Sequence, residues 1–390
     1  MKRHKLICVA GARPNFMKVA PLLRLLRSAP NFEAVLVHTG QHYDDKLSGQ
    51  FFRDLELPPP DHFLSVGSGS HARQTAEIMT RFEPIVMAES PDGVVVVGDV
   101  NSTVAAAFVA AKMHIPVIHI ESGLRSFDRA MPEEINRLMT DAVSDLLFVT
   151  EESGRRNLLN EGIPKHRIHF AGNLMIDSLH RMLPRALKSP VLDSLGLSKK
   201  RFGLLTLHRP SNVDNPKRFS EILDVLAEIA GTLPLIFPVH PRTRASVVNG
   251  AGRYDNIRFI DPLGYSDFVC LMANSFVVFT DSGGVQEETT VLGVPCLTLR
   301  ENTERPVTIE RGTNVLAGTS RASIFEAWKT AALRPQSGRV PPLWDGASAE
   351  RHLAVLSEYF RRRYADNAPF STIPAAMAQT VGGYVPGGQP

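Results

Sequence analysis

The chain contains 390 residues, of which 43% are hydrophobic and 21% charged, and its formal net charge is +3. This length is sufficient for two domains. A charge this small, carried by dispersed arginines, gives no support to nucleic-acid binding, which usually shows as a clustered basic face. No run approaches the roughly 20 apolar residues of a membrane span, and the apolar run after MKRHK is short for a signal peptide. We therefore expect a cytoplasmic protein with no membrane partner, whose first apolar run is a β-strand.

The cysteines and histidines give no sign of a disulfide or a metal centre. Cys8, Cys270 and Cys296 each lie inside an apolar run, where a reduced and buried thiol is expected. The 13 histidines form neither an HExxH motif nor a tight cluster with cysteine. We predict that the protein binds no metal.

Short β-branched runs alternate with longer amphipathic stretches along the chain. The expected strands are 5–10, 34–39, 93–98, 116–120, 146–150 and 167–171 in the first half, then 202–207, 234–239, 257–260, 276–280 and 294–299. These runs are almost continuously apolar, which is typical of parallel strands covered by helices on both faces. After Pro132, Ile135, Leu138, Met139 and Ala142 follow the spacing of one helix face. The alternation predicts an α/β fold with doubly wound parallel sheets.

This alternating pattern runs twice, with a pause at 171–190. Two Rossmann-like domains of similar size, facing each other across a cleft, explain it best. We place the N-terminal domain at 1–172 and a nucleotide-binding C-terminal domain at 173–348. A final helix at 349–365 is expected to rejoin the first domain, and the segment 366–390, poor in charge, is expected to be a mobile tail.

In open α/β sheets the ligand lies beyond the carboxyl ends of the strands, and charged or small residues follow most of the expected strands. The first strand leads into GARPNFMK, where Gly11 suits a tight turn and Arg13 and Lys18 place positive charge beside a helix N-terminus. This combination suits a phosphate group, although a plain strand–helix turn with solvated cations explains it equally well. His240 directly follows another expected strand.

The segment DSGGVQEE is more specific. Ser282, Gly283 and Gly284 open a helix with exposed amides, and the two glycines let an anion approach the backbone closely. Glu288 lies one turn into this helix, where a carboxylate suits ribose hydroxyls. Simple helix capping is the alternative, but capping needs no paired glycines, so we favour a site for a diphosphate sugar. No GxGxxG motif follows a strand, which argues against a nicotinamide cofactor.

Several acid–base candidates follow strands or begin a helix. They are Asp99, Glu121, Glu133 and His208. A carboxylate at the end of an apolar strand is costly to desolvate unless it is paired or lines a pocket. The expected partners of the first two carboxylates are Arg13, Arg125 or His208, and a purely structural ion pair is the alternative.

Three candidates also have simpler explanations. Glu133 is four residues before Arg137, which is a favourable helix pair. A lone histidine such as His208 is usually structural, although this one directly follows a strand. Phe268 precedes an apolar helix segment, and it suits either a core position or stacking on a nucleobase.

The motifs together resemble a known family. GARPNFMKVAPL, TGQHYD, VVGDVNST, HIESGLRSFDRAMPEEINR, LTLHRPSNVDN, FPVHPRT, DSGGVQEE and LRENTERP occur in the order found in the non-hydrolysing UDP-N-acetylglucosamine 2-epimerases. The resemblance covers roughly residues 5–365. It implies a glycosyltransferase-B-like fold with the active site between the domains, a homodimer, and interconversion of UDP-GlcNAc and UDP-ManNAc.

The resemblance also assigns residues to the site. Those expected to contact the nucleotide sugar are Arg13, Lys18, His240, Phe268, Ser282, Gly283, Gly284, Glu288 and Arg305. Those expected to handle protons are Asp99, Glu121, Glu133 and His208. Within the first group, Arg13 and the turn at 282–284 would hold the diphosphate. Phe268 would contact uracil, and Glu288 would bind the ribose.

Three positions depart from the family pattern. Asn15 and Ser211 stand where many members have glutamate, and both lie beside candidate site residues, so they would suit a subgroup with a different sugar. Asp44 stands where some bacterial members have a glutamine linked to activation by a second UDP-GlcNAc. Its presence argues against that regulation.

The expected chemistry explains why several carboxylates are needed. The C2 hydrogen of the sugar is not next to a carbonyl group, so a simple base cannot remove and return it. Without a cofactor, we expect anti elimination of UDP to a 2-acetamidoglucal intermediate, then re-addition with protonation of the opposite face. The rival interpretations are a glycosyltransferase of the same architecture, an epimerase of a modified UDP-HexNAc, a hydrolysing variant, and a non-catalytic sugar-nucleotide sensor.

Overall fold

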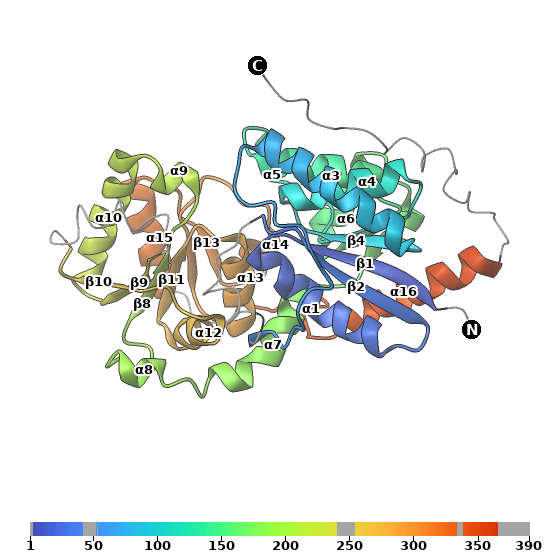
Figure 1. The fold of residues 1–390 in the computed structure, drawn as a ribbon. Helices are drawn as coiled ribbons and strands as arrows, with labels where there is room; N and C mark the ends of the chain where they lie inside the picture. Colours follow the sequence, from blue (N-terminus) through green and yellow to red (C-terminus); the bar gives the residue numbers. More distant parts are fainter. Residues whose placement is uncertain (1–2, 42–51, 53, 240–253, 334–337, 366–390) are drawn as a thin grey trace, which may run out of the picture.

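The structure is a computed structural model that describes residues 3–41, 52, 54–239, 254–333 and 338–365. Two parallel β-sheets with flanking helices form two lobes, which lie side by side (Figure 1). We call them the N-terminal lobe and the C-terminal lobe. The α/β class expected from the sequence is therefore confirmed.

The N-terminal lobe is built on a seven-stranded sheet in the order β3-β2-β1-β4-β5-β6-β7. Its strands are β1 (His4–Ala10), β2 (Phe32–His38), β3 (His62–Phe63), β4 (Gly93–Val97), β5 (Val117–Ile120), β6 (Leu146–Val149) and β7 (Ile168–Phe170). Its helices are α1 (Arg13–Ser28), α3 (His71–Glu89), α4 (Asn101–Lys112), α5 (Pro132–Val143) and α6 (Glu152–Asn160), with a 3-10 turn at Lys165–Arg167.

The C-terminal lobe contains a six-stranded sheet in the order β10-β9-β8-β11-β12-β13. Its strands are β8 (Gly203–Thr206), β9 (Leu235–Pro238), β10 (Ile257–Ile260), β11 (Val277–Thr280), β12 (Cys296–Thr298) and β13 (Asn314–Leu316). Its helices are α9 (Pro210–Val213), α10 (Pro216–Ala230), α12 (Tyr265–Asn274), α13 (Gly283–Leu292), α14 (Val307–Glu310) and α15 (Arg321–Leu333).

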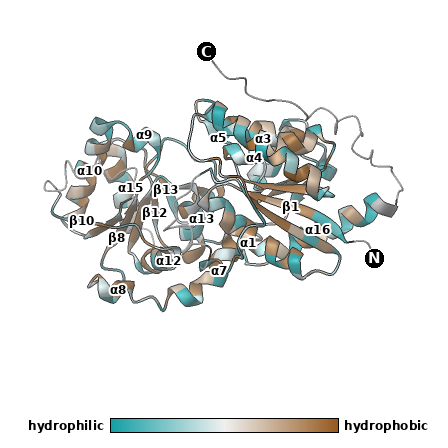
Figure 2. Cartoon of the chain, viewed as in Figure 1, coloured by the Kyte–Doolittle hydropathy of each residue, from teal (hydrophilic) through white to brown (hydrophobic). Residues whose placement is uncertain are grey.

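Alternate residues of each central strand pack on opposite faces of its sheet. In β1, Leu6 and Cys8 join one hydrophobic cluster with α1, whereas Ile7 and Val9 join another with α3 and α4. This two-sided burial explains why the strands are apolar almost throughout, and they are correspondingly brown in Figure 2. The three cysteines are buried and unbridged, as expected.

Two helices connect the lobes. α7 (Leu174–Ala186) packs against α1 in the N-terminal lobe and against α12 and α13 in the C-terminal lobe. The short α8 (Val191–Ser194) follows it and leads into β8. The last described helix, α16 (Ser348–Ala365), returns to pack on α1 beside the first sheet (Figure 1).

Every strand expected from the sequence is present, but two short strands were missed. β3 and β13 each lie at an edge of a sheet, where a few residues suffice to pair with one neighbour. The domain boundaries remain predictions, and the tail at 366–390 lies outside the described residues. Within the described part of the chain, no helix is both long and apolar enough to cross a membrane.

Candidate active site

Three neighbouring strands of the N-terminal lobe deliver candidate residues to one edge of the sheet. β1, β4 and β5 are adjacent, and the segments that follow them carry Lys18, Asp99 and Glu121. Gly98 shows how closely these segments approach. It has a φ of +67°, and a Cβ atom there would lie 3.5 Å from Lys18 Nζ and 3.8 Å from Glu121 Oε1. The sequence therefore predicted this convergence correctly.

A buried group of charged side chains joins the two lobes, and we call it the interlobe cluster. It consists of Lys18 and Glu121 from the N-terminal lobe and Glu287, Glu304 and Arg305 from the C-terminal lobe. Lys18 Nζ lies 2.6 Å from Glu121 Oε2, and Arg305 Nη2 lies 3.1 Å from Glu121 Oε1. Each of these side chains is at most 7% exposed. Glu121 thus receives one cation from each lobe.

Arg305 is the centre of this cluster. Its Nε lies 2.9 Å from Glu287 Oε1, and its Nη1 lies 2.6 Å from Glu304 Oε1. Burial lowers the pKa of Arg305. The carboxylates of Glu287, Glu121 and Glu304 raise it by more, so the pKa is well above its ordinary value. The guanidinium fits here because Gly283 has no side chain. A Cβ atom there would lie 2.4 Å from Arg305 Nη1.

Glu304 connects the cluster to the HRPSN segment after β8. Its carboxylate accepts hydrogen bonds from Arg300 at 2.7 Å and from Arg209 at 3.4 Å, besides the one from Arg305. Burial raises the pKa of Glu304, yet the surrounding arginines outweigh it and hold that pKa well below its ordinary value. This residue therefore carries a permanent negative charge that offsets part of the arginine charge.

Asp99 and Glu121 have partners other than those expected. Asp99 Oδ2 lies 2.5 Å from Arg137 Nη1, and the backbone carbonyl of Asp99 accepts a hydrogen bond from Asn136. Burial raises the Asp99 pKa, but Arg137, Lys18 and Arg305 lower it below its ordinary value. The prediction of Arg125 as a partner was wrong.

The reason is that Arg125 turns away from this edge. Its guanidinium pairs with Asp141 of α5 at 2.7 Å and with Glu161, the residue that follows α6 in the same lobe, at 2.6 Å. A loop arginine can reach several carboxylates, and only the fold decides among them.

Helix α5 begins with two adjacent glutamates, Glu133 and Glu134, which have different surroundings. Glu134 is buried and accepts hydrogen bonds from the amides of Ser126 and Phe127, so it fixes the preceding loop. Arg137 pairs with Glu134 at 2.9 Å, three residues away. The expected Glu133–Arg137 pair is therefore wrong. Glu133 is half-buried and has no hydrogen bond or ion pair with another described residue, so its carboxylate is uncommitted.

His208 is also paired differently from the expectation. Its Nδ1 lies 3.0 Å from Asp281 Oδ1, and its side chain is 44% exposed, whereas Asp281 is fully buried. Asp281 also accepts hydrogen bonds from the backbone amides of His208 and Arg209. His208 therefore does not pair with Asp99 or Glu121, and Asp281 holds both its ring and its backbone.

The start of α13 is not capped by a side chain. Ser282 is the N-cap residue, yet its hydroxyl makes no capping hydrogen bond, and its amide donates to Thr280 Oγ1. Gly284 packs closely on α7, because a Cβ atom there would lie 2.8 Å from Met175 Cε. Both glycines are therefore needed for close packing, Gly283 against Arg305 and Gly284 against Met175. Simple helix capping by a side chain does not explain the motif.

Glu288 and Phe268 lie deeper in the C-terminal lobe. Glu288 is buried and accepts a hydrogen bond of 2.7 Å from the Tyr265 hydroxyl. Burial raises the pKa of Glu288 to about 7. Phe268 is half-buried on α12 and packs against the hydrophobic core. Core packing, the simpler of the two explanations for Phe268, is thus present in the structure, and contacts with ribose and uracil remain predictions.

Two of the candidate site residues cannot be compared with the structure. Arg13 begins α1, but its side chain lies outside the described residues, as do His240 and Asp44.

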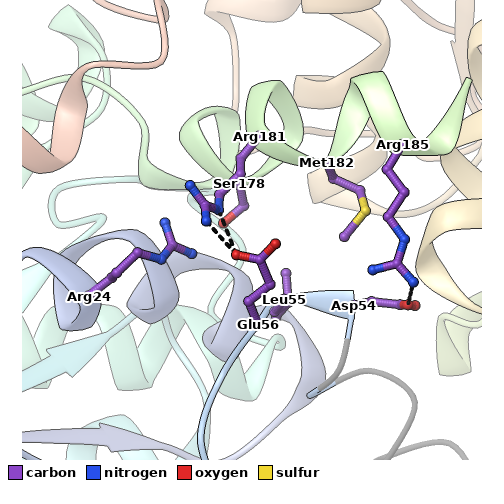
Figure 3. A pocket seen from close by; sticks show the side chains of 8 residues that line it. All are labelled: Arg24, Asp54, Leu55, Glu56, Ser178, Arg181, Met182 and Arg185. Carbon is purple, nitrogen blue, oxygen red and sulfur yellow. Dashed lines mark hydrogen bonds and ion pairs between the residues drawn. The ribbon is translucent and has the colours of Figure 1, made fainter.

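A pocket where α1 meets α7 is shown in Figure 3. Arg24, Arg181 and Arg185 line it, together with Asp54 and Glu56. None of the candidate residues lines this pocket.

Sequence reasoning missed several members of the site. They are Asn136, Arg137, Asp281, Glu287 and Glu304. Glu304 lies next to Arg305 and Glu287 next to Glu288, so proximity to a chosen residue was an available signal. For Arg137 no such signal existed, because a helix pair explained it fully.

Comparisons with known proteins agree with this arrangement. The sequence model of a family described as UDP-N-acetylglucosamine 2-epimerase matches residues 24–357. The chain belongs to the UDP-N-acetylglucosamine 2-epimerase family. The epimerase of Methanocaldococcus jannaschii is 40% identical over 364 residues, which cover 90% of this chain and 99% of the relative. The crystal structure of that enzyme in complex with UDP-GlcNAc and UDP has a TM-score of 0.86 and covers 91% of this chain and 99% of that one.

The epimerase family includes relatives with other sugars. A UDP-2,3-diacetamido-2,3-dideoxy-D-glucuronate 2-epimerase of Pseudomonas aeruginosa is 41% identical over 330 residues, covering 84% of this chain and 92% of the relative. The fold of this chain is thus the glycosyltransferase-B-like fold of the 2-epimerases, as the resemblance implied.

Proposed function

We propose that this chain interconverts UDP-GlcNAc and UDP-ManNAc by elimination and re-addition of UDP. The observation that carries the proposal is the interlobe cluster, in which Glu121 of one lobe meets Arg305 of the other beside the start of α13. A nucleotide sugar that binds at the start of α13 would present its sugar ring to the carboxylates after β4 and β5. The M. jannaschii relative, solved with UDP-GlcNAc and UDP, supports this choice of substrate.

The first half of the proposed reaction removes UDP. A carboxylate takes the proton from C2, the C2–H electron pair forms the C1–C2 double bond, and the C1–O bond electrons leave with UDP. The products are 2-acetamidoglucal and UDP. Positive charge around the diphosphate would stabilise the leaving group, since preorganised charge is usually the largest contribution to catalysis.

The second half returns UDP to C1 while a proton is delivered to the opposite face of C2. Two faces need two proton-handling groups. Glu121, Asp99 and Glu133 are the carboxylates available for these roles, and they come from three successive segments of the N-terminal lobe. Glu133 suits the role of a mobile proton carrier, because it has no partner among the described residues.

His208 would act from the C-terminal lobe. Its Nδ1 faces the buried Asp281 carboxylate, so Nδ1 carries a hydrogen and Nε2 is the nitrogen free to meet the ligand. Asp281 therefore orients this ring, which suits a group placed near the departing diphosphate. Lys18 and Arg305, which neutralise Glu121, would be shared with the diphosphate once the ligand is bound.

The decisive experiment uses the pure protein and UDP-GlcNAc alone in D₂O, followed by NMR. We expect UDP-ManNAc with deuterium at C2, formed without any acceptor. No product without an acceptor would favour a glycosyltransferase. Free ManNAc with UDP would identify a hydrolysing enzyme, and binding without any turnover would identify a sensor.

A modified UDP-HexNAc is the second candidate for the substrate. The P. aeruginosa relative supports it, because this diacetamido-glucuronate 2-epimerase is 41% identical to this chain and the M. jannaschii enzyme is 40% identical. Asn15 and Ser211 stand close to candidate site residues in the sequence. Competition between UDP-GlcNAc and UDP-2,3-diacetamido-glucuronate in one reaction, with kcat/KM for each, separates the two candidates.

A further inference from the structure

His119 is a buried histidine that the proposed reaction does not use. It lies in β5 and is fully inaccessible to solvent. Its Nδ1 is 2.7 Å from Asp141 Oδ1, and its Nε2 is 2.8 Å from the carbonyl oxygen of Gly98. Both neighbours are hydrogen-bond acceptors, so the ring lies between two groups to which its nitrogens can donate.

Asp141 completes this arrangement from helix α5. Its second oxygen accepts a hydrogen bond of 3.0 Å from the amide of Gly123 and lies 2.7 Å from Arg125 Nη2. Burial raises the pKa of Asp141, but His119 and Arg125 lower it below its ordinary value. The carboxylate is therefore ionised, and it contacts both His119 and Arg125.

The pair thus holds two loops at once. His119 fixes the carbonyl of Gly98, one residue before Asp99, and Asp141 fixes the amide of Gly123, two residues after Glu121. Gly98 and Gly123 have φ values of +67° and +78°, so both loops turn where no side chain restrains the backbone. These two hydrogen bonds therefore fix the backbone at two glycines, the residue type whose backbone has the greatest conformational freedom.

We propose that His119 and Asp141 are positioning residues, which set the separation and orientation of the loops that carry Asp99 and Glu121. The inference rests on the proposed function, because it assigns a purpose to that separation. Neither side chain reaches the surface, so both act through the backbone and not on the sugar. One buried pair, anchored in a central strand and a helix, would thereby place two carboxylates from different loops around one carbon atom.

Two variants test the proposal. His119→Gln replaces a ring whose two nitrogens contact Asp141 and Gly98 by an amide with a single nitrogen, which cannot span both positions. Asp141→Asn keeps the volume but removes the negative charge. We expect kcat to fall at least about tenfold in each, because small misplacements of reacting groups are costly, with KM and UDP affinity within about threefold of the wild type.

His352→Gln is the matched control. His352 lies in the same lobe, is 1% exposed, and its Nδ1 contacts the carbonyl of Ser348 within α16. We expect this variant to lose stability but to keep the kcat of the folded protein. If His119→Gln and Asp141→Asn are folded and keep kcat within about twofold, or if UDP binding falls in parallel with kcat, the positioning role is refuted.

Hydrogen exchange gives a readout that does not depend on activity. In His119→Gln, we expect faster exchange of the amides at 98–101 and 122–124 and no such change in His352→Gln. Unchanged exchange at these loops refutes the proposal. A wild-type protein with no epimerase activity on either sugar refutes the proposed function instead, and accelerated exchange would then still support the structural connection between the loops.

Discussion

Two glutamates that are equally hidden from solvent, one in each lobe, have opposite surroundings. Glu121 and Glu288 are each 3% exposed. Glu121 lies between Lys18 and Arg305, whereas Glu288 has the neutral hydroxyl of Tyr265 and a pKa raised by burial to about 7. Burial alone therefore does not decide what a carboxylate can do; the neighbouring cations do. In our proposal the first glutamate handles protons, whereas the family resemblance implies that the second binds the ribose.

The largest expected effect comes from Glu121→Gln. The amide cannot accept the C2 proton, and we expect turnover of UDP-GlcNAc to fall by about 10²–10⁴-fold. Asp99→Asn and Glu133→Gln are expected to lose at least about a hundredfold. The measurement is the initial rate of epimerisation, with the exposed Glu310→Gln as the control. Full activity of Glu121→Gln would assign that residue a purely structural role.

Removal of Arg305 tests whether its positive charge stabilises the buried carboxylates of the interlobe cluster. Arg305→Ala leaves Glu121, Glu287 and Glu304 buried with less compensating charge, and we expect the free energy of unfolding to fall by about 3–5 kcal/mol. Urea unfolding measures this change. The control is Arg361→Ala, which removes an exposed ion pair on α16 and should change stability by less than about 0.5 kcal/mol. Equal losses in the two variants would contradict the role of the cluster.

The raised pKa of Glu288 predicts how the free energy of unfolding depends on pH. The folded protein holds the Glu288 proton up to about pH 7, whereas an unfolded glutamate loses it near the ordinary value of 4.5. Between these values the folded state binds the extra proton, so this residue makes the free energy of unfolding fall as pH rises, by about 3 kcal/mol at most.

The corresponding measurement compares Glu288→Gln with the wild type in urea at pH 5 and pH 8. The variant lacks this proton, so its stability relative to the wild type should increase with pH. Glu151 and Asp177 also have pKa values raised by burial, to about 7 and about 6, but they are present in both proteins and cancel in the difference. A difference that does not change with pH would contradict the raised pKa.

The smallest effect is expected for Tyr265→Phe. The variant loses the hydrogen bond to Glu288 Oε1, and we expect a cost of about 1–2 kcal/mol in unfolding free energy. This hydrogen bond lowers the Glu288 pKa, so its loss should raise that pKa. The pH range over which the free energy of unfolding falls should then extend to higher pH. Tyr359→Phe, in α16, is the control, since its hydroxyl accepts a hydrogen bond from Arg363, one turn further along the same helix. A Tyr265→Phe variant more stable than the wild type would show that the hydrogen bond from this hydroxyl to Glu288 does not stabilise the folded protein.

Much of the fold follows from local pattern in the sequence. The apolar runs gave the central strands, because a strand buried on both faces needs apolar residues at successive positions. Pro132 and the periodic residues after it gave α5 with its correct start. The rule that ligands lie beyond the carboxyl ends of strands also predicts that the segments carrying Lys18, Asp99 and Glu121 meet at one edge of the sheet.

The partners of these residues depended on tertiary structure. Nothing local distinguishes Arg125, which pairs with Asp141, from Arg137, which reaches Asp99. The same holds for Glu133 and Glu134, adjacent acids of which only the second fixes a loop. Sequence patterns determine which surface of an element is buried, because that depends on residues three or four apart. They do not determine which charge meets which across two lobes, because a flexible side chain can reach several partners and only the packed backbone selects among them.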